Sequence, residues 1–334
     1  RLGAAATAVA ARGRGESGDL DSYLDESARQ IDEAIGHAHA SEPVSMRQLH
    51  REGTARIEAR YEARQKTGGL VGVTTGLREL DALSGGWHGS ELYVIAARPG
   101  MGKTAFAWFT ATAAARSGVP VIFVSLEMGR FGLHDRAVAM TARVPATEIR
   151  TGGLTPGSLG RMIRSAAEIS ALPIHVDDQT GQTLAQIRAK VRRWRMRDAP
   201  AATFPRALAI VDYLQIIAGS RSKNMQRHEQ VGEFSRGLKN LSRELEIPVI
   251  ALSQLNRAVE NRADKRATLA DLRESGEIEQ DADVIAFLHR PCVYDATADR
   301  EHADLTIAKE RNGQCTRIPL RWQESVVRFS DEAT

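Results

Sequence analysis

Cysteine, long apolar stretches and any large excess of charge are all scarce in this chain. The two cysteines, Cys292 and Cys315, have no Cys or His neighbours at metal-ligand spacing. This argues against a disulfide framework or a structural zinc site and predicts a reducing compartment. No apolar run reaches the roughly 18 residues that a transmembrane helix needs. A net charge of +3, from 45 Lys and Arg against 42 Asp and Glu, is too small for a binder that relies on massed cations.

What remains is the composition of a soluble intracellular protein. The 334 residues are 42% hydrophobic and 26% charged, enough for one large α/β domain with an appendage. Residues 1–15 are rich in Ala and Arg and resemble a weak targeting sequence. Because no initiator Met precedes them, the end of a trimmed helix explains them at least as well.

The first 66 residues differ from the rest of the chain. Apolar residues recur at helical spacing in two segments, 20–35 and 46–61, and the sequence Ser-Glu-Pro at 41–43 separates them. Each segment predicts an amphipathic helix without a core of its own. Two interpretations stay open: a helical hairpin that lies on its own domain, or a linker that docks on a neighbouring subunit.

From residue 67 onward, short apolar strands alternate with helices. This alternation predicts an α/β domain with a mostly parallel sheet that is covered by helices on both faces. Beyond residue 300 the pattern becomes an antiparallel β tail that turns at Asn312 and Gly313. The expected strands are 92–97, 119–125, 173–176, 208–212, 248–253, 284–289, 303–309, 317–321 and 326–329, and the expected helices are 104–116, 131–143, 158–170, 184–197 and 230–246.

A phosphate-binding loop follows the first of these strands. The segment 97–104 reads ARPGMGKT and opens a helix, which is the context that such a loop requires. Gly100 and Gly102 let successive N–H groups point at phosphate oxygens, and the helix N-terminus adds partial positive charge. Lys103 can reach the β- and γ-phosphates, and the Thr104 hydroxyl can ligate Mg²⁺. The general motif begins with Gly, and Ala97 occupies that position here.

Three further strands end in polar side chains that would complete an ATPase site. Asp212 ends an apolar strand and suits the magnesium shell. Glu127 follows another strand at its carboxyl end, where a base could orient the attacking water, although an acid at a helix N-terminus is also common. Gln254 ends a third strand and could contact the γ-phosphate.

At this point the sequence resembles the DnaB-type replicative DNA helicases, within the wider group of RecA-type ATPases. The resemblance runs in order over about residues 70–315, and more weakly over 20–66, which is similar to the linker-helix region of that family. In this family Ala at the head of the phosphate loop is usual. The matching stretches are 75–81 (TGLRELD), 97–104 (ARPGMGKT), 125–128 (SLEM), 212–215 (DYLQ), 252–255 (LSQL), 271–276 (DLRESG), 278–283 (IEQDAD) and 309–313 (KERNG).

The resemblance implies a homo-hexameric ring with ATP and Mg²⁺ bound between neighbouring subunits. Thr104 and Asp212 would hold the metal, Glu127 would activate water, and Gln254 would couple the γ-phosphate to the DNA loops. The residues of the nucleotide-binding loop would be Arg98, Pro99, Gly100, Met101, Gly102, Lys103 and Thr104.

Lys309 and Arg311 alternate along a strand and therefore face the same side. From the residues alone they are typical of edge-strand charges that prevent aggregation. The resemblance implies instead that they reach into the adjacent subunit's site, as the arginine finger and its partner. Gln314 follows Gly313 where the family usually has Pro, so the turn that carries the finger can differ.

Two regions compete as the surface for single-stranded DNA. The helix at 184–197 is rich in cations, but they spread around its circumference, so we favour an ordinary solvated helix there. The resemblance places the second region at the central channel, where backbone N–H groups and Arg273 would grip phosphates without reading bases. The first region contains Arg188, Lys190, Arg192, Arg193, Arg195 and Arg197, and the second contains Arg257, Arg262, Lys265, Arg266, Arg273, Glu274, Ser275 and Gly276.

We therefore predict a helical linker region over 1–66, the end of an N-terminal domain and its linker helix, followed by a RecA-like helicase ATPase domain over 67–334. The family implies 5′→3′ translocation on single-stranded DNA, a cytoplasmic location in a bacterial host, and contacts with a primase and a helicase loader. The alternatives are a RecA-like recombinase, against which the stretches at 98–99 and 271–276 argue, and an ATP-binding assembly factor that does not unwind DNA. The second alternative requires a missing catalytic group, and none is missing.

Overall fold

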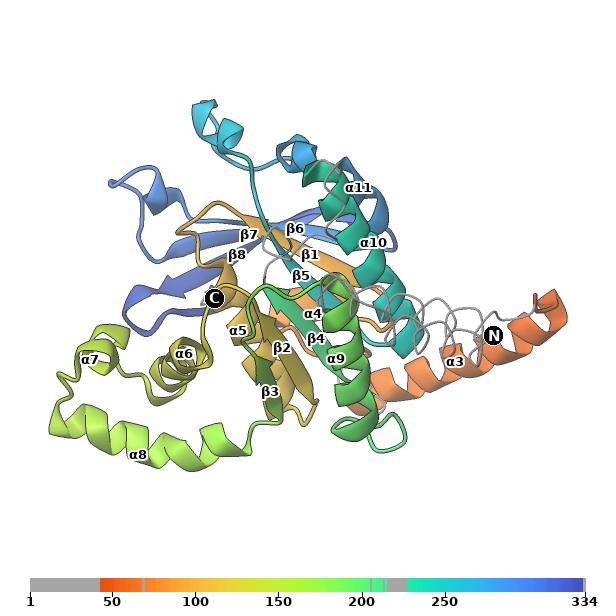
Figure 1. Ribbon diagram of the computed structural model, residues 1–334, viewed down its shortest axis with the longest axis horizontal. Helices are drawn as coiled ribbons and strands as arrows, with labels where there is room; N and C mark the ends of the chain where they lie inside the picture. Colours follow the sequence, from red (N-terminus) through yellow and green to blue (C-terminus); the bar gives the residue numbers. More distant parts are fainter. Residues whose placement is uncertain (1–42, 68–69, 205, 213, 215–226, 333–334) are drawn as a thin grey trace, which may run out of the picture.

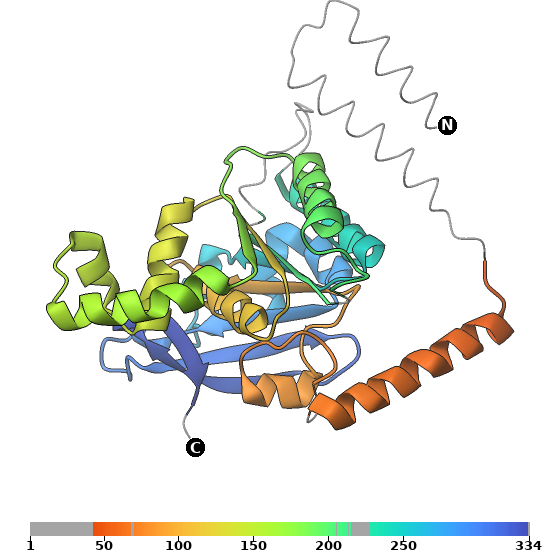
Figure 2. The ribbon, with the colours of Figure 1, turned by 90° about the horizontal axis from the view of Figure 1, so that it is seen from below.

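The computed structural model describes residues 43–67, 70–204, 206–212, 214 and 227–332. The first predicted helix, at 20–35, lies outside these residues. The described part of the chain is built around one central sheet, with helices on both of its faces (Figures 1 and 2).

Within the described residues the sheet has nine strands, in the order β3-β2-β4-β5-β1-β6-β7-β8-β9. The first six strands in this order, from β3 across to β6, pair in parallel. The last three, β7, β8 and β9, continue the sheet with antiparallel pairing. The predicted fold class, a mostly parallel sheet with an antiparallel C-terminal part, is therefore confirmed. The strands are β1 (Leu92–Ala97), β2 (Val121–Ser125), β3 (Ile174–Asp177), β4 (Leu208–Asp212), β5 (Val249–Gln254), β6 (Val284–His289), β7 (His302–Glu310), β8 (Thr316–Gln323) and β9 (Arg328–Asp331).

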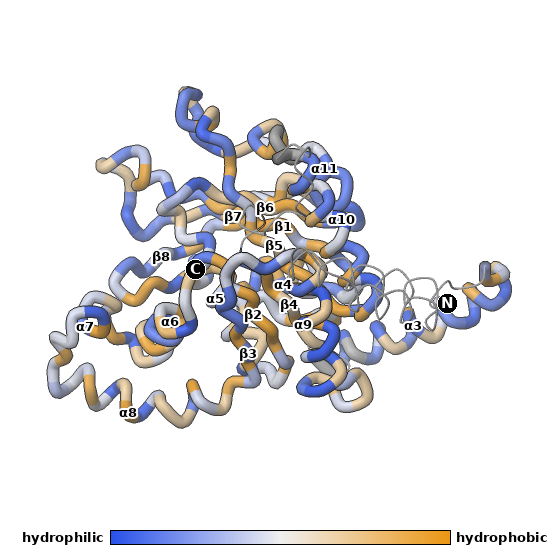
Figure 3. Tube along the Cα trace, in the orientation of Figure 1, coloured by the Kyte–Doolittle hydropathy of each residue, from blue (hydrophilic) through white to orange (hydrophobic). Residues whose placement is uncertain are grey.

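Side chains of the central strands alternate between two hydrophobic cores. Tyr93 and Ile95 of β1 pack in the core beneath α5, whereas Leu92 and Val94 pack in the core beneath α9 and α10. Apolar residues consequently concentrate in the middle strands, as the hydropathy colouring of Figure 3 shows. Burial on both faces explains why β1 reads as a continuous apolar run in the sequence.

Most helices lie where the periodicity predicts them, within about three residues at each end. The periodicity does not predict the short helices α4, α7 and α11, because six or seven residues give too few turns for a periodic signal. No described helix has the length and apolarity needed to cross a membrane. The α-helices are α3 (Met46–Thr67), α4 (Arg78–Ser84), α5 (Lys103–Arg116), α6 (Arg130–Ala142), α7 (Ala146–Thr151), α8 (Pro156–Ala171), α9 (Leu184–Arg197), α10 (Arg227–Leu245) and α11 (Gly276–Asp281), and the 3₁₀ helices are η2 (Arg257–Asn261), η3 (Leu269–Ser275), η4 (Pro291–Val293) and η5 (Glu324–Val326).

Helix α3 extends away from the rest of the domain (Figures 1 and 2). Its apolar residues Met46, Leu49, Ile57 and Tyr61 are 49–76% exposed. The predicted second helix is thus confirmed. Along the part of the chain that the structure describes, its apolar stripe remains uncovered.

Phe329 of β9 joins the C-terminal hairpin to the phosphate loop. Its ring is fully buried, 5.7 Å from the ring of Phe106 and 4.5 Å from that of Trp322. We expect Phe329→Ala to lower the free energy of unfolding by about 3–5 kcal/mol, because it removes a buried ring and leaves a cavity. Urea unfolding measures this change. The matched variant Phe131→Ala removes a ring that is 79% exposed and should stay within about 0.5 kcal/mol of the unchanged chain.

Candidate nucleotide and DNA sites

The phosphate loop connects the end of β1 to the start of α5. Its two central glycines have positive backbone angles, φ +83° at Gly100 and φ +91° at Gly102, which side chains disfavour. At Gly102 a Cβ atom would also lie 3.1 Å from the Phe329 ring. The loop ends at the N-terminus of α5, where the helix dipole adds partial positive charge. The loop therefore has the geometry of an anion-binding site.

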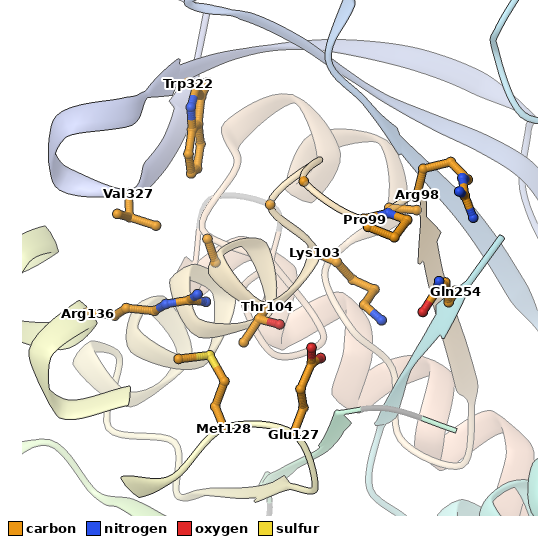
Figure 4. A pocket seen from close by; sticks show the side chains of 14 residues that line it. Arg98, Pro99, Lys103, Thr104, Glu127, Met128, Arg136, Gln254, Trp322 and Val327 are labelled. Carbon is orange, nitrogen blue, oxygen red and sulfur yellow. The ribbon is translucent and has the colours of Figure 1, made fainter. Parts of the chain in front are cut away.

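A pocket of about 370 Å³ opens in front of this loop (Figure 4). It brings together residues from the ends of several strands and from α6. The sequence-predicted residues Lys103, Thr104, Glu127 and Gln254 all line it. The complete lining consists of Ala97, Arg98, Pro99, Gly100, Gly102, Lys103, Thr104, Ala105, Glu127, Met128, Arg136, Gln254, Trp322 and Val327.

A buried carboxylate and two half-buried cations lie close together at the base of the pocket. Burial raises the pKa of the Asp212 carboxyl, an effect that nearby Lys103 opposes. Burial likewise lowers the pKa of the Lys103 amine, and Asp212 and Glu127 counteract this shift. The pKa of Arg136 is lowered by burial in the same way. Each of these charges is therefore opposed by burial and favoured by its neighbours of opposite sign.

The Asp212 carboxylate ends β4 beside Lys103 and Thr104. Its side chain is fully buried, and neither carboxylate oxygen has a hydrogen-bond partner among the described residues. The Thr104 hydroxyl is close enough to lower the Asp212 pKa without meeting the geometry of a full hydrogen bond. A carboxylate and a hydroxyl beside a phosphate loop are oxygen donors of the kind that Mg²⁺ prefers. The residues present therefore fit a magnesium ion.

Glu127 follows β2 and Gln254 ends β5, the two strands that flank β4 and its last residue, Asp212. The backbone N–H of Leu126 donates to the carbonyl of Asp212 at 2.7 Å, so the exposed Glu127 is held next to the end of β4. Gln254 pairs in register with Ala97, at the head of the phosphate loop. Figure 4 shows Glu127 and Gln254 directed toward Lys103. The structure thus brings the predicted base and the predicted γ-phosphate contact to one pocket.

Two residues of the predicted nucleotide-binding loop have other contacts. Arg98 borders the pocket, but its guanidinium forms an ion pair with Glu260 at 2.7 Å and donates to the carbonyl of Leu255 at 2.7 Å. Met101 is 1% exposed, and its sulfur accepts a hydrogen bond from the backbone N–H of Arg290. Both residues remain part of the predicted nucleotide-binding loop, while their side chains make contacts within the domain. Arg98 connects the loop to η2, and Met101 anchors the loop in the core.

Sequence reasoning missed four residues of the site. Arg136 and Met128 reach the pocket from the α6 side, and Trp322 and Val327 reach it from the C-terminal hairpin. A fifth, Arg290, supports the loop from behind: its Nη1 donates to the carbonyl of Gly100 at 3.1 Å, and its guanidinium stacks 4.6 Å from the Trp322 ring. Met128 ends the stretch 125–128, whereas no local motif marks the other positions. The pairing of β8 with β9 brings Trp322 and Val327 beside the loop.

Lys309 and Arg311 lie at the other end of the sheet from the phosphate loop. Both side chains donate to carbonyls of the α11 end, Lys309 to Ala282 and Arg311 to Gln280, so they share one side as predicted. Arg311 also pairs with Asp283, whose N–H bonds to the start of β1. The phosphate loop follows the end of β1, about 17 Å away along the strand. Neither cation can reach the nucleotide of its own subunit.

Most cations of α9 are engaged within the domain. Arg192 pairs with Glu244 at 2.6 Å, and Lys190 pairs with Asp177 at 2.7 Å. The buried Arg195 donates to the carbonyl of Phe204 at 2.8 Å. These contacts agree with the interpretation of α9 as an ordinary surface helix and leave little of its charge for nucleic acid.

In the second candidate region, η2 stands out from the body of the domain (Figure 1). Arg257 is exposed on it, and Gly276 is exposed at the start of α11. Arg262, in contrast, pairs with the buried Asp271 at 2.5 Å and also donates to a backbone carbonyl of the same loop. The structure therefore gives Arg262 a role in holding the loop together. The side chains of residues 273–275 lie outside the described ones.

Known proteins resemble the chain over almost its whole length. Residues 72–331 match the family described as DnaB-like helicase C terminal domain. The replicative DNA helicase DnaB of Leifsonia xyli subsp. xyli is 38% identical over 336 aligned residues, covering 100% of this chain and 71% of the relative. The DnaB helicase of Geobacillus stearothermophilus is 37% identical, covering 98% of this chain and 71% of the relative.

Two solved structures agree with this result. One, described as an ATPase domain, superposes with a TM-score of 0.79 at 34% identity, covering 87% of this chain and 100% of that one. A DnaB-like replicative helicase, described with its interactions with primase, superposes with a TM-score of 0.77 at 33% identity, covering 93% and 72%. With the phosphate loop, its buried carboxylate and these similarities in agreement, the chain belongs to the DnaB-like family of replicative DNA helicases, which are ATP-dependent enzymes.

Proposed function

We propose that six copies of this chain form a ring that hydrolyses ATP between neighbouring subunits, moves 5′→3′ along one DNA strand and excludes the other. The observation that carries this proposal is the separation of the phosphate loop from Lys309 and Arg311. A head-to-tail ring brings one end of each domain against the opposite end of the next. That arrangement supplies each nucleotide with the two cations that its own subunit cannot provide.

In this proposal the phosphates of ATP rest on the backbone N–H groups of the loop, with Lys103 beside them. Thr104 and Asp212 would hold Mg²⁺, which neutralises phosphate charge when it is bound. The buried Asp212 oxygens without hydrogen-bond partners among the described residues support this assignment. With the terminal phosphate on the Glu127 and Gln254 side, the nucleoside would extend toward the pocket wall that includes Trp322.

Glu127 would accept the proton of the attacking water. Its position at the pocket mouth supports this role, because it is exposed and can reach a water molecule beside the terminal phosphate. Gln254 would sense that phosphate. It directly precedes the segment that continues into η2, so a change at its amide could be passed to the loops around Arg257.

DNA would contact these loops by its backbone. Arg257 and residues 273–276 would face the central channel, and Arg262 would keep the loop in shape. Gripping phosphates without reading bases suits a motor that must pass any sequence. The small positive charge of each chain is sufficient, because six weak sites act on one strand.

Helix α3 would dock on the neighbouring subunit in the ring. Its exposed apolar residues and its extension away from its own domain support this interpretation. We extend to this chain the primase contact for which a DnaB-like relative is described. A helicase loader and a cytoplasmic location in a bacterial host remain predictions of the family resemblance.

Strand displacement on a forked duplex tests the proposal. With ATP, we expect the ring to unwind forks that carry a 5′ tail, and we expect Lys103→Ala to abolish unwinding. The mass of the assembly in solution reports whether six chains associate. Failure of the unchanged chain to unwind DNA while it binds both ATP and DNA would contradict the helicase assignment. Filaments on DNA would favour a recombinase, and binding of ATP without hydrolysis would favour an assembly factor.

A further inference from the structure

Asp283 lies between α11 and β6, at the end of the sheet that carries Arg311. Its side chain is buried, with the residue 5% exposed. Its backbone N–H donates to the carbonyl of Leu92 at 2.9 Å, and the N–H of Leu92 donates back to Asp283 Oδ2 at 2.8 Å. This reciprocal pair fixes the carboxylate to the start of β1, the strand that ends in the phosphate loop.

The two oxygens of Asp283 bind two different cations. Oδ1 pairs with Nη1 of Arg311 at 3.2 Å, and Oδ2 accepts from Nζ of Lys239 at 2.6 Å. Lys239, on α10, also donates to the carbonyl of Ser90 at 2.8 Å, so it is held in place independently. The backbone N–H of Arg311 donates to the carbonyl of Asp283 at 3.0 Å. Asp283 therefore holds both the main chain and the guanidinium of Arg311.

A second fixed acceptor orients the guanidinium of Arg311. Nη2 donates to the carbonyl of Gln280 near the end of α11, where the helix dipole favours a cation. The side chain nevertheless remains 45% exposed. A long, flexible side chain is thus oriented by fixed acceptors while part of it stays accessible to a neighbouring subunit.

We propose that Asp283 is the positioning residue of the arginine finger: its carboxylate orients the Arg311 guanidinium for the ATP site of the adjacent subunit. This inference rests on the proposed role of Arg311. The physical reason is preorganisation, because a cation displaced by about 1 Å from developing charge can lose about 10²-fold in rate.

Asp283→Asn tests the inference with little change in shape. Its remaining oxygen can still accept from Leu92 and Lys239, but its amide group cannot form an ion pair with Arg311. We expect kcat for ATP hydrolysis to fall by about 10²-fold, with KM for ATP and the mass of the ring unchanged. Asp283→Glu keeps the charge but displaces the carboxylate, and should lower kcat as well. Glu168→Gln, in an exposed pair with Arg116, is the matched control and should behave like the unchanged chain.

Mixed rings separate positioning from a merely structural role. Each active interface needs an intact phosphate loop from one subunit and an intact finger from the next. Asp283→Asn mixed with Lys103→Ala should therefore regain hydrolysis at about one interface in four, whereas Asp283→Asn mixed with Arg311→Ala should regain none. If Asp283→Asn instead damaged the structure of its whole subunit, mixing it with Lys103→Ala would not restore hydrolysis.

The possible failures can be told apart. Wild-type hydrolysis by Asp283→Asn, or recovery on mixing with Arg311→Ala, would overturn the inference while leaving the finger intact. Loss of ring assembly in both Asp283 variants would also overturn it, since Asp283 would then be a structural residue. Wild-type hydrolysis by Arg311→Ala alone would instead refute the proposed finger.

Discussion

Replacing Arg311 with alanine is expected to slow ATP hydrolysis by about 10³–10⁵-fold while ATP affinity stays near that of the unchanged chain. Arg311 lies at the sheet end opposite its own phosphate loop, so the substitution removes no contact to its own nucleotide. Its charge matters only where negative charge develops on the neighbour's transferred phosphoryl group. The loss should therefore appear in kcat and leave binding intact.

The measurement combines steady-state hydrolysis with equilibrium binding of a fluorescent ATP analogue to the same rings. Arg317→Ala is the matched control, because Arg317 is also an exposed arginine of the β7–β8 hairpin, and its one ion pair among the described residues is a distant one, with Asp304 at 3.9 Å. It should hydrolyse ATP within about threefold of the unchanged chain. If Arg311→Ala retains hydrolysis within tenfold of the unchanged rate, the trans-acting role is wrong.

The parts of the fold that the sequence predicts well are those governed by local pattern. The bounds of β1, β4 and β6 agree with the prediction at every residue, because each is an apolar run bounded by polar or turn-forming residues. The pocket follows from the same reasoning. Asp212 and Gln254 both end parallel strands, and parallel strands align their carboxyl ends at one edge of the sheet.

What the sequence does not predict depends on contacts between distant segments. Trp322 lies near the phosphate loop because β8 and β9 fold back beside α5. Arg290 lies near it because it directly follows β6, which pairs with β1. The direction of the Arg98 side chain follows from Glu260, which is remote in sequence. Motif spacing places the backbone of a residue, whereas the direction of a long side chain depends on the partner that the tertiary fold provides.

The same distinction applies to charge. The number of cations in α9 is typical of a nucleic-acid patch, but most of them form ion pairs or hydrogen bonds with neighbouring residues such as Glu244. From the sequence, Arg311 is typical of an edge-strand charge. In the structure, Asp283 and the carbonyl of Gln280 hold its guanidinium, while the side chain stays partly exposed to solvent. The number of cations in a segment is therefore a weaker indicator of function than the acceptors that hold each one.

Replacing Glu127 with glutamine should slow hydrolysis by about 10²–10⁴-fold, because glutamine has the shape of glutamate but cannot accept a proton from the attacking water. Glu127 lies at the mouth of the pocket, and Ser125 fixes the turn around it by donating to the carbonyl of Met128 at 2.7 Å. The substitution leaves this turn in place. Rings of the variant should therefore bind ATP and single-stranded DNA as well as the unchanged rings do.

Single-turnover hydrolysis on preformed rings measures this effect separately from product release. Glu324→Gln, an exposed change in η5 beside the same pocket wall, is the control and should hydrolyse ATP at the unchanged rate. Because Asp212 is buried at the base of the pocket and fits the magnesium shell, Glu127 is the carboxylate in the pocket lining that remains available as a base. Hydrolysis within tenfold of the unchanged rate would mean that water is activated by another group, and would remove Glu127 from the catalytic residues.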